Sequence, residues 1–190
     1  TCRNILQSME DQGLPELLPD EDTEREMYYE TKSMLHKQGF ERYEISNYAK
    51  PGYECRHNIG YWTGTEYLGL GLGASSYIQG FRFHNESDLS LYDKIQMTGT
   101  DADEKLHQEI TKLSDKEKME EFMFLGLRMI KGVSGSEFFQ RFGQNMWNVY
   151  GNVLNKLKDE GLIIVDMPDV RLSDYGIDVS NYVLSEFLLD

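Results

Sequence analysis

The sequence is short of cysteine, of basic residues and of long apolar runs. Its 190 residues contain only two cysteines, Cys2 and Cys55. Two thiolates cannot by themselves complete a Cys₄ zinc site or hold an iron–sulfur cluster. No apolar run approaches the ~20 residues that span a bilayer, and no secretory signal is visible. These absences favour a reducing cytoplasm as the location.

Basic residues are also scarce, since 19 Lys and Arg stand against 33 Asp and Glu and give a net charge of −14. A surface this acidic repels phosphate backbones, so we expect no general binding to nucleic acid. At 39% hydrophobic and 12% aromatic residues, the composition is otherwise that of an ordinary globular chain. The first residue is Thr1 rather than Met, which favours a processed product or a fragment.

The first half of the chain alternates helical and extended patterns after an irregular lead-in at residues 1–19. An acidic first turn at residues 20–26 predicts a helix that Gly39 ends, and residues 40–46 alternate as a strand does. Helix, glycine and strand in this order are typical of a parallel-sheet protein. The patterns then predict a loop at 47–65, strands at 67–72 and 75–83, a short helix at 88–97 and an edge strand at 106–113.

From Ser114 onwards the pattern is that of a small helical domain. Ser114 and Glu117 have the spacing of a capping box, and apolar residues at helical spacing follow as far as Ile130. Further helices are expected at 134–143, 145–161 and 175–188, with a two-stranded wing around Pro168 before the last of them. Three helices and a hairpin make a winged-helix-like layout.

The third helix of this layout lacks the charges of a DNA-recognition helix. It carries only Lys156 and Lys158 against Asp159 and Glu160, whereas recognition requires Arg or Lys directed at phosphates and base edges. A role as a lid, or as a packing partner of the first half, is the expectation.

The central stretch, residues 53–80, holds the residues best suited to binding. A neutral imidazole ligates metals and haem iron, which makes His57 the main candidate ligand, and Tyr61 and Trp62 offer flat apolar faces. Asn58 is able to orient the imidazole or to bind a propionate. The alternative is a histidine hydrogen-bonded to backbone, with both aromatic side chains anchoring the loop, and spacing alone favours this commoner case.

Two further features of the stretch carry weaker signals. Cys55 is a less favoured ligand for haem iron or a metal, and it makes only half of a zinc site with His57. Gly69, Gly71 and Gly73 superficially resemble a dinucleotide fingerprint, but the spacing is GxGxG and a strand pattern follows instead of a helix. A strand that packs closely against a neighbour is the simpler interpretation.

The remaining carboxylate and histidine candidates suggest no shared site. On a strand, Glu41 and Glu44 are three positions apart and would face opposite sides of the sheet. His36, His84 and His107 have no ligand partners nearby in the sequence and are expected to be structural or surface groups.

A composite of segments carries a resemblance to a known family. RYEISNYAKPG (42–52), ECRHN (54–58), HNIGYW (57–62), YLGLGLGA (67–74), EFMFLGLRMIKGV (121–133) and RLSDYG (171–176) occur in this order. The chain thereby resembles the oxygen-independent coproporphyrinogen III oxidase-like radical-SAM proteins, and most of all their haem-chaperone branch. The resemblance covers nearly the whole chain from Asp20 onwards.

The resemblance implies an α/β fold in which a partial parallel (β/α) barrel segment at 20–105 precedes a small helical winged-helix-like domain at 106–190. It implies haem binding by His57, Asn58, Tyr61 and Trp62, with His57 on the iron and Cys55 the less favoured ligand. It also implies contact of Gly71, Ala74 and Tyr77 with the edge of an S-adenosylmethionine site.

One departure from the family limits what the chain is expected to do alone. Members carry a CxxxCxxC loop that holds a 4Fe–4S cluster, and this chain has none. The cluster and most of the S-adenosylmethionine site are therefore expected in a missing N-terminal half, and the fragment alone should be catalytically inactive. The expected function is haem binding and transfer to apoproteins. The alternatives are a true oxidase that decarboxylates porphyrin propionates, or a non-catalytic protein-interaction module.

Overall fold

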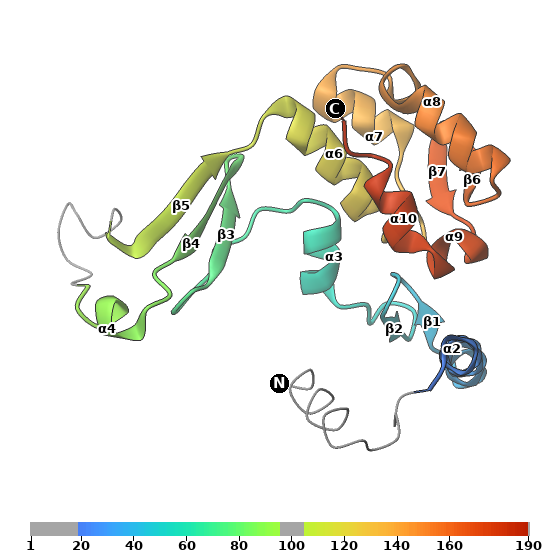
Figure 1. Cartoon of the computed structure of the whole chain (residues 1–190), viewed down its shortest axis with the longest axis horizontal. Helices are drawn as coiled ribbons and strands as arrows, with labels where there is room; N and C mark the ends of the chain where they lie inside the picture. The colour runs from blue at the N-terminus through green and yellow to red at the C-terminus, as the bar shows by residue number, and fades with distance from the viewer. Residues whose placement is uncertain (1–18, 96–104, 190) are drawn as a thin grey trace. The chain divides into compact units, whose positions relative to one another are not determined.

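The computed structural model describes residues 19–95 and 105–189 (Figure 1). These residues group into two compact units. Residues 19–42 and 48–53 form the first unit, and residues 43–47 and 54–189 belong to the second. The expected lead-in up to residue 18, Cys2 and the predicted helix end at Met97 lie outside the described residues. Among the described residues, none of the helices has the length and apolar character needed to cross a bilayer.

The first unit begins with the predicted helix, α2 (Glu21–Lys37). Asp20 is its N-cap, and the carboxylate accepts a hydrogen bond from the Thr23 amide at 2.8 Å. Hydrogen bonds from Thr23 also hold the pKa of Asp20 below its usual range. The chain leaves the helix through Gly39, which has a φ of +79°. The local capping chemistry therefore places this helix correctly from sequence.

A short hairpin completes the first unit. β1 (Glu41–Arg42) pairs antiparallel with β2 (Tyr48–Ala49). The Arg42 guanidinium carbon lies 4.5 Å from the centroid of the Tyr28 ring on α2, and Arg42 Nε donates to Tyr48 Oη at 3.1 Å. The predicted strand at 40–46 is thus too long, because the chain turns back at residues 43–47, where the Tyr43 amide donates to the Asn47 carbonyl.

The second unit contains a three-stranded sheet in the order β3–β4–β5, with both pairings antiparallel (Figure 1). β3 (Ser75–Ile78) and β4 (Phe81–Asn85) are joined by Gln79 and Gly80, both at positive φ, as expected of a tight hairpin turn. The predicted edge strand is confirmed as β5 (His107–Lys112). The short helix α4 (Leu89–Tyr92) lies within the predicted 88–97 segment.

The mixed α/β class is confirmed, but the expected parallel strand pairing is wrong. Every strand pair among residues 19–95 and 105–189 is antiparallel. The β1–β2 and β3–β4 connections are only a few residues long, whereas parallel neighbours need a crossover of about a dozen residues or more. The predicted strand at 75–83 is in fact a hairpin, and the predicted strand at 67–72 is reduced to one bridge between Tyr67 and Tyr77.

The helical half follows the predicted winged-helix-like order. Its elements are α6 (Asp115–Gly126), α7 (Gly135–Phe142), α8 (Met146–Asp159), β6 (Ile163–Asp166), β7 (Asp169–Leu172), α9 (Asp174–Asp178) and α10 (Ser180–Ser185). The capping box is confirmed, since Ser114 Oγ accepts from the Glu117 amide and the Glu117 carboxylate accepts from the Ser114 amide. α6 ends at Gly126 rather than Ile130, and the predicted last helix is divided near Val179.

A single apolar cluster fills the helical half. Its fully buried members come from α6, α7, α8, the β6–β7 hairpin and the C-terminal helices, and include Met123, Leu127, Phe138, Met146, Tyr150, Leu154, Leu157, Val183 and Phe187. The domain boundary expected at residues 105 and 106 stays a prediction; β5, which begins just after it, pairs with β4, which precedes it.

Tyr150, at the centre of this core, offers a test of the packing. The side chain is 1% exposed, and its hydroxyl has no hydrogen-bond partner among the described residues. Burial raises the pKa of Tyr150, because the phenolate cannot be hydrated inside the core. With the folded pKa above the unfolded one, the stability that Tyr150 supplies is complete below about pH 10 and falls as the pH rises further.

Tyr150→Phe is therefore expected to keep or raise the free energy of unfolding near neutral pH, by up to about 1 kcal/mol. It should also flatten the loss of stability above about pH 10, where the unfolded phenol would otherwise release its proton. Urea denaturation of both proteins at neutral and alkaline pH measures both effects. A clear loss of stability at neutral pH would show that the hydroxyl is hydrogen-bonded.

Candidate functional site

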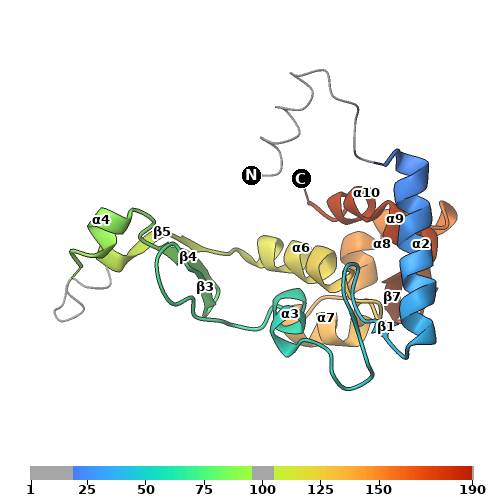
Figure 2. The same ribbon diagram turned by 90° about the horizontal axis from the view of Figure 1, so that it is seen from below.

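The HNIGYW segment forms a helix, which corrects the loop expected at 47–65. α3 (Arg56–Trp62) begins after Cys55, whose side chain makes no capping bond. The helical spacing places His57 and Tyr61 on one face, and Asn58 and Trp62 on the adjacent face. α3 lies against α6 in the second unit (Figure 2).

The first face of α3 carries a row of edge-on aromatic contacts that supports His57. The rings of His57 and Tyr61 meet edge-on with centroids 4.7 Å apart, and Tyr61 meets Tyr67 in the same way, also at 4.7 Å. Backbone hydrogen bonds of 2.9 Å in both directions hold Tyr67 against Tyr77 of β3. The side chains of His57, Tyr61 and Tyr67 line a small hollow of about 120 Å³. The imidazole is thus held in place by packing.

The ring nitrogens of His57 have no hydrogen-bond partner among the described residues, and the side chain is exposed. The alternative of a histidine bonded to backbone is not what the structure contains. An exposed imidazole with unbonded nitrogens and an aromatic support has the chemistry of a ligand for a metal ion or haem iron.

Trp62 lies on the adjacent face and is half-buried. The Arg128 guanidinium carbon is 4.3 Å from the centroid of the Trp62 ring, a cation–π contact that covers one side of the indole. Trp62 Nε1 and Arg128 Nε are buried without hydrogen-bond partners among the described residues. Trp62 therefore offers at most one face to a ligand, and that face belongs to a different hollow from the His57 imidazole.

Arg128 is itself fixed by the turn at residues 43–47. The Ile45 amide donates to the Arg128 carbonyl at 3.0 Å, and the Ile130 amide donates to the Tyr43 carbonyl at 3.1 Å. Glu44 holds the turn, since its buried carboxylate accepts from the Ser46 amide and from Asn47 Nδ2. The glutamate is structural here, as its neighbours are hydrogen-bond donors of its own turn.

The glycine run forms a pinned loop instead of the expected strand. The buried Asn85 donates from Nδ2 to the carbonyls of Gly71 at 2.8 Å and Gly69 at 3.3 Å, and the Gly69 amide donates to Ser76 Oγ at 3.0 Å. A Cβ on Gly69 would lie 2.2 Å from the Ser75 carbonyl oxygen, so only glycine fits. Gly71 and Gly73 have φ values of +100° and +64°, which excludes a regular strand.

The three residues expected at an S-adenosylmethionine edge lie in or next to this loop. The Gly71 carbonyl is occupied by Asn85, and the Ala74 carbonyl accepts from the Asn85 amide. Tyr77 lies on β3, with the Arg82 guanidinium carbon 5.5 Å from its ring centroid. Gly71, Ala74 and Tyr77 therefore lie close together in the chain, at the loop and the start of β3.

The other candidates are not part of α3, and of these Cys55 directly precedes its first residue. Cys55 is an exposed free thiol. His36 pairs with Glu41 at 2.8 Å, His84 lies 3.5 Å from Glu109, and the His107 ring meets that of Phe83 at a tilt, with centroids 4.4 Å apart. Among the described residues, His, Cys, Asp and Glu form no group of three able to hold a metal ion.

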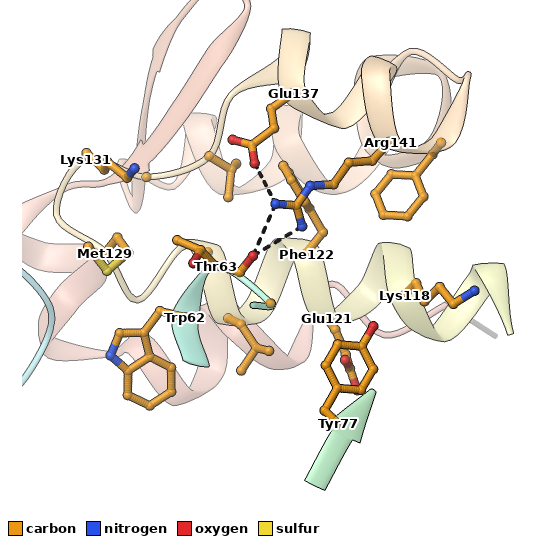
Figure 3. A pocket seen from close by; sticks show the side chains of 16 residues that line it. Trp62, Thr63, Tyr77, Lys118, Glu121, Phe122, Met129, Lys131, Glu137 and Arg141 are labelled. Atoms are coloured by element: carbon orange, nitrogen blue, oxygen red, sulfur yellow. Dashed lines mark hydrogen bonds and ion pairs between the residues drawn. The ribbon is translucent and has the colours of Figure 1, made fainter. Parts of the chain in front are cut away.

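A larger cavity of about 270 Å³ opens beside Trp62, and sequence reasoning missed it (Figure 3). α3, β3, α6, the 129–133 segment and α7 all contribute to its lining. Arg141 of α7 spans one side, because its guanidinium donates to Glu137 Oε1 at 2.7 Å and twice to the Thr63 carbonyl at 3.2 Å. We name it the Trp62 cavity.

Comparison with known proteins gives one family and several relatives. Residues 113–179 match the family described as the HemN C-terminal domain. Proteins named "Heme chaperone HemW" from Lactococcus lactis and Bacillus subtilis are 37% and 36% identical over 173 and 172 residues, with 91% and 90% of this chain covered. A mitochondrial "Radical S-adenosyl methionine domain-containing protein 1" from Mus musculus is 32% identical over 182 residues, 90% of this chain.

A solved structure also resembles the fold of this chain. The coproporphyrinogen III oxidase HemN from Escherichia coli, described as a radical SAM enzyme, superposes with a TM-score of 0.70 over 93% of this chain at 16% identity. The chain spans 44% of that protein, 44% of the two bacterial relatives and 40% of the mouse relative. At this identity the likeness shows the fold alone.

Proposed function

We propose that α3 binds haem and that the parent protein is a haem chaperone. The chain belongs to the HemN-like family and is the counterpart of the C-terminal part of HemW-type proteins. The observation that carries the proposal is His57, an exposed imidazole with unbonded nitrogens, held edge-on by Tyr61 at 4.7 Å. The names of the relatives support haem as the ligand.

Residues on and beside α3 support the proposal of a bound haem. His57 supplies the nitrogen lone pair for the iron, and the Tyr61–Tyr67 pair keeps the imidazole from turning away. Asn58 is placed one position along the helix, where we propose that it binds a propionate. On the adjacent face, one side of the Trp62 indole packs against Arg128. Trp62 therefore supports α3.

The family membership also suggests further binding partners for the parent protein. We propose that Gly71, Ala74 and Tyr77 contact the adenine edge of S-adenosylmethionine, and that the remainder of that site and a 4Fe–4S cluster lie in an N-terminal part of the parent. Apoproteins would accept the haem, and the cytoplasmic location stays a prediction. The oxidase alternative has only the fold likeness in its support.

The experiment is a hemin titration followed by the Soret band. His57→Ala is expected to weaken binding by about tenfold or more and to shift the band, because the iron loses its nitrogen ligand. Cys55→Ser should leave both unchanged. His36→Ala is the matched control for adventitious binding, since His36 is an exposed histidine on α2 that pairs with Glu41.

Two results would contradict the assignment. If Cys55→Ser moved the band and His57→Ala did not, the iron would be bound by the thiolate. If His57→Ala and His36→Ala lowered affinity equally, the binding would be non-specific and the haem proposal would fail.

A further inference from the structure

We propose that the Trp62 cavity is a second binding site, which takes a carboxylate carried on an apolar body and uses Lys131 as its charge partner. For a free carboxylate the inference does not depend on haem ligation by His57, because the cavity and the imidazole line different hollows; for a porphyrin propionate it rests on the proposed function. Two sources share this chemistry: the propionate arm of a bound porphyrin, and a free aliphatic carboxylate.

The apolar part of the cavity is suited to a hydrocarbon chain or one aromatic ring. Its wall includes Trp62, Phe122, Leu125, Met129 and Phe142, contributed by three helices and the segment between α6 and α7. At about 270 Å³, the cavity is at the small end of ligand sites, which begin near roughly 300 Å³. A whole porphyrin does not fit inside it, whereas a propionate arm or a medium-length chain does.

The charges around the cavity favour an anion. Its two lining carboxylates are both engaged, Glu121 by Arg82 at 3.0 Å and Glu137 by Arg141 at 2.7 Å. Lys118, at the opposite end of the cavity from Lys131, pairs with Asp115 at 3.3 Å (Figure 3).

Lys131 is the exception. Among the residues that the structure describes, it has no ion-pair or hydrogen-bond partner, although the chain carries a net charge of −14. An unpaired cation at the edge of an apolar cavity attracts a ligand that is apolar at one end and anionic at the other.

The segment that carries Lys131 is rigidly held, so the cavity exists before a ligand arrives. Val133 and Val170 exchange backbone hydrogen bonds of 2.8 and 3.0 Å, which tie the segment to β7. Gly126 admits the Val133 side chain, since a Cβ at position 126 would lie 2.4 Å from Val133 Cγ1. A preformed site loses little entropy when it binds.

The experiment measures octanoate binding by calorimetry, and hemin and hemin dimethyl ester binding by absorbance. Four variants are compared with the parent chain: Lys131→Ala, Leu125→Trp to fill the cavity, His57→Ala, and Lys158→Ala as an exposed lysine outside the cavity. The free-carboxylate form of the proposal predicts that octanoate binds the parent chain and that Lys131→Ala weakens it about fivefold. Lys158→Ala and His57→Ala should then leave octanoate binding unchanged.

The propionate form predicts a different pattern. Octanoate then fails to bind, Lys131→Ala weakens hemin about fivefold, and the dimethyl ester binds Lys131→Ala and the parent chain equally. Leu125→Trp should abolish octanoate binding in the free-carboxylate form, and should weaken hemin at least as much as Lys131→Ala in the propionate form, while the protein still unfolds cooperatively. The proposal is overturned if Lys131→Ala changes the affinity for neither octanoate nor hemin. It is also overturned if the Leu125→Trp variant binds both ligands as tightly as the parent chain does. Loss of hemin binding in His57→Ala with octanoate binding intact separates this site from the haem proposal.

Discussion

Phe138→Ala is expected to lower the free energy of unfolding by about 3–5 kcal/mol. Phe138 is fully buried at the junction of α6, α7 and α8. Its ring centroid lies 5.4 Å from Phe122, 4.8 Å from Phe142 and 6.1 Å from Tyr150. Truncation removes these ring contacts and leaves a cavity that three helices cannot close without moving, which is why the expected cost lies at the upper end for a single substitution.

The neighbouring residue provides a matched control. Phe139 is on the same helix, one position along, and is 57% exposed. Phe139→Ala has the same change in volume and helix propensity but should cost less than about 1 kcal/mol. Urea denaturation followed by circular dichroism compares the two variants. Equal losses would mean that α7 does not present Phe138 to the core.

The helical half was predictable because its signals are local. The Ser114–Glu117 capping box, the Asn145 cap and the terminating Gly143 are each read within one helical turn, and the structure has all of them. The same signals could not indicate that α6 stops at Gly126. That end is set by the contact between Gly126 and Val133 and by the pairing of residues 128–130 with the 43–47 turn.

The first half was less predictable because its conformation depends on distant partners. Alternation from Tyr67 to Leu72 suggests a strand, yet the loop is held by Asn85, which is 14 residues from Gly71. α3 has only seven residues, and such a helix is marginal by itself. Arg141 fixes its end by two hydrogen bonds to the Thr63 carbonyl, 78 residues away in sequence. No local pattern encodes these contacts.

In the candidate site, too, local contacts were predictable from the sequence and contacts between distant residues were not. Sequence reasoning found His57 and Tyr61, whose contact follows from helical spacing once α3 is known. It did not foresee that Trp62 faces Arg128 rather than the same hollow as His57, nor that Lys131 and Arg141 reach the cavity. A hint was present in EFMFLGLRMIKGV, where two cations stand among apolar residues of a strongly acidic chain.

Gly132→Ala is expected to cost about 3 kcal/mol or more, because it adds a steric clash to an unfavourable backbone conformation. Gly132 has a φ of +73°, and a Cβ there would lie 2.0 Å from the Val170 carbonyl oxygen. That oxygen already accepts the Val133 amide, so the methyl group and the hydrogen bond cannot both remain. The segment would move away from β7 and carry Lys131 with it, which should also weaken binding at the Trp62 cavity.

Gly161→Ala isolates the backbone contribution. Gly161 has a nearly equal φ of +71°, and nothing lies within 4 Å of the Cβ position. It should therefore lose only about 1–2 kcal/mol, the cost of left-handed backbone for an L-residue, and should leave binding at the cavity unchanged. Denaturant midpoints and cavity-ligand titrations of both variants give the comparison. If the two substitutions cost the same, the 129–133 segment is free to shift from Val170, and the rigidity assigned to the cavity is wrong.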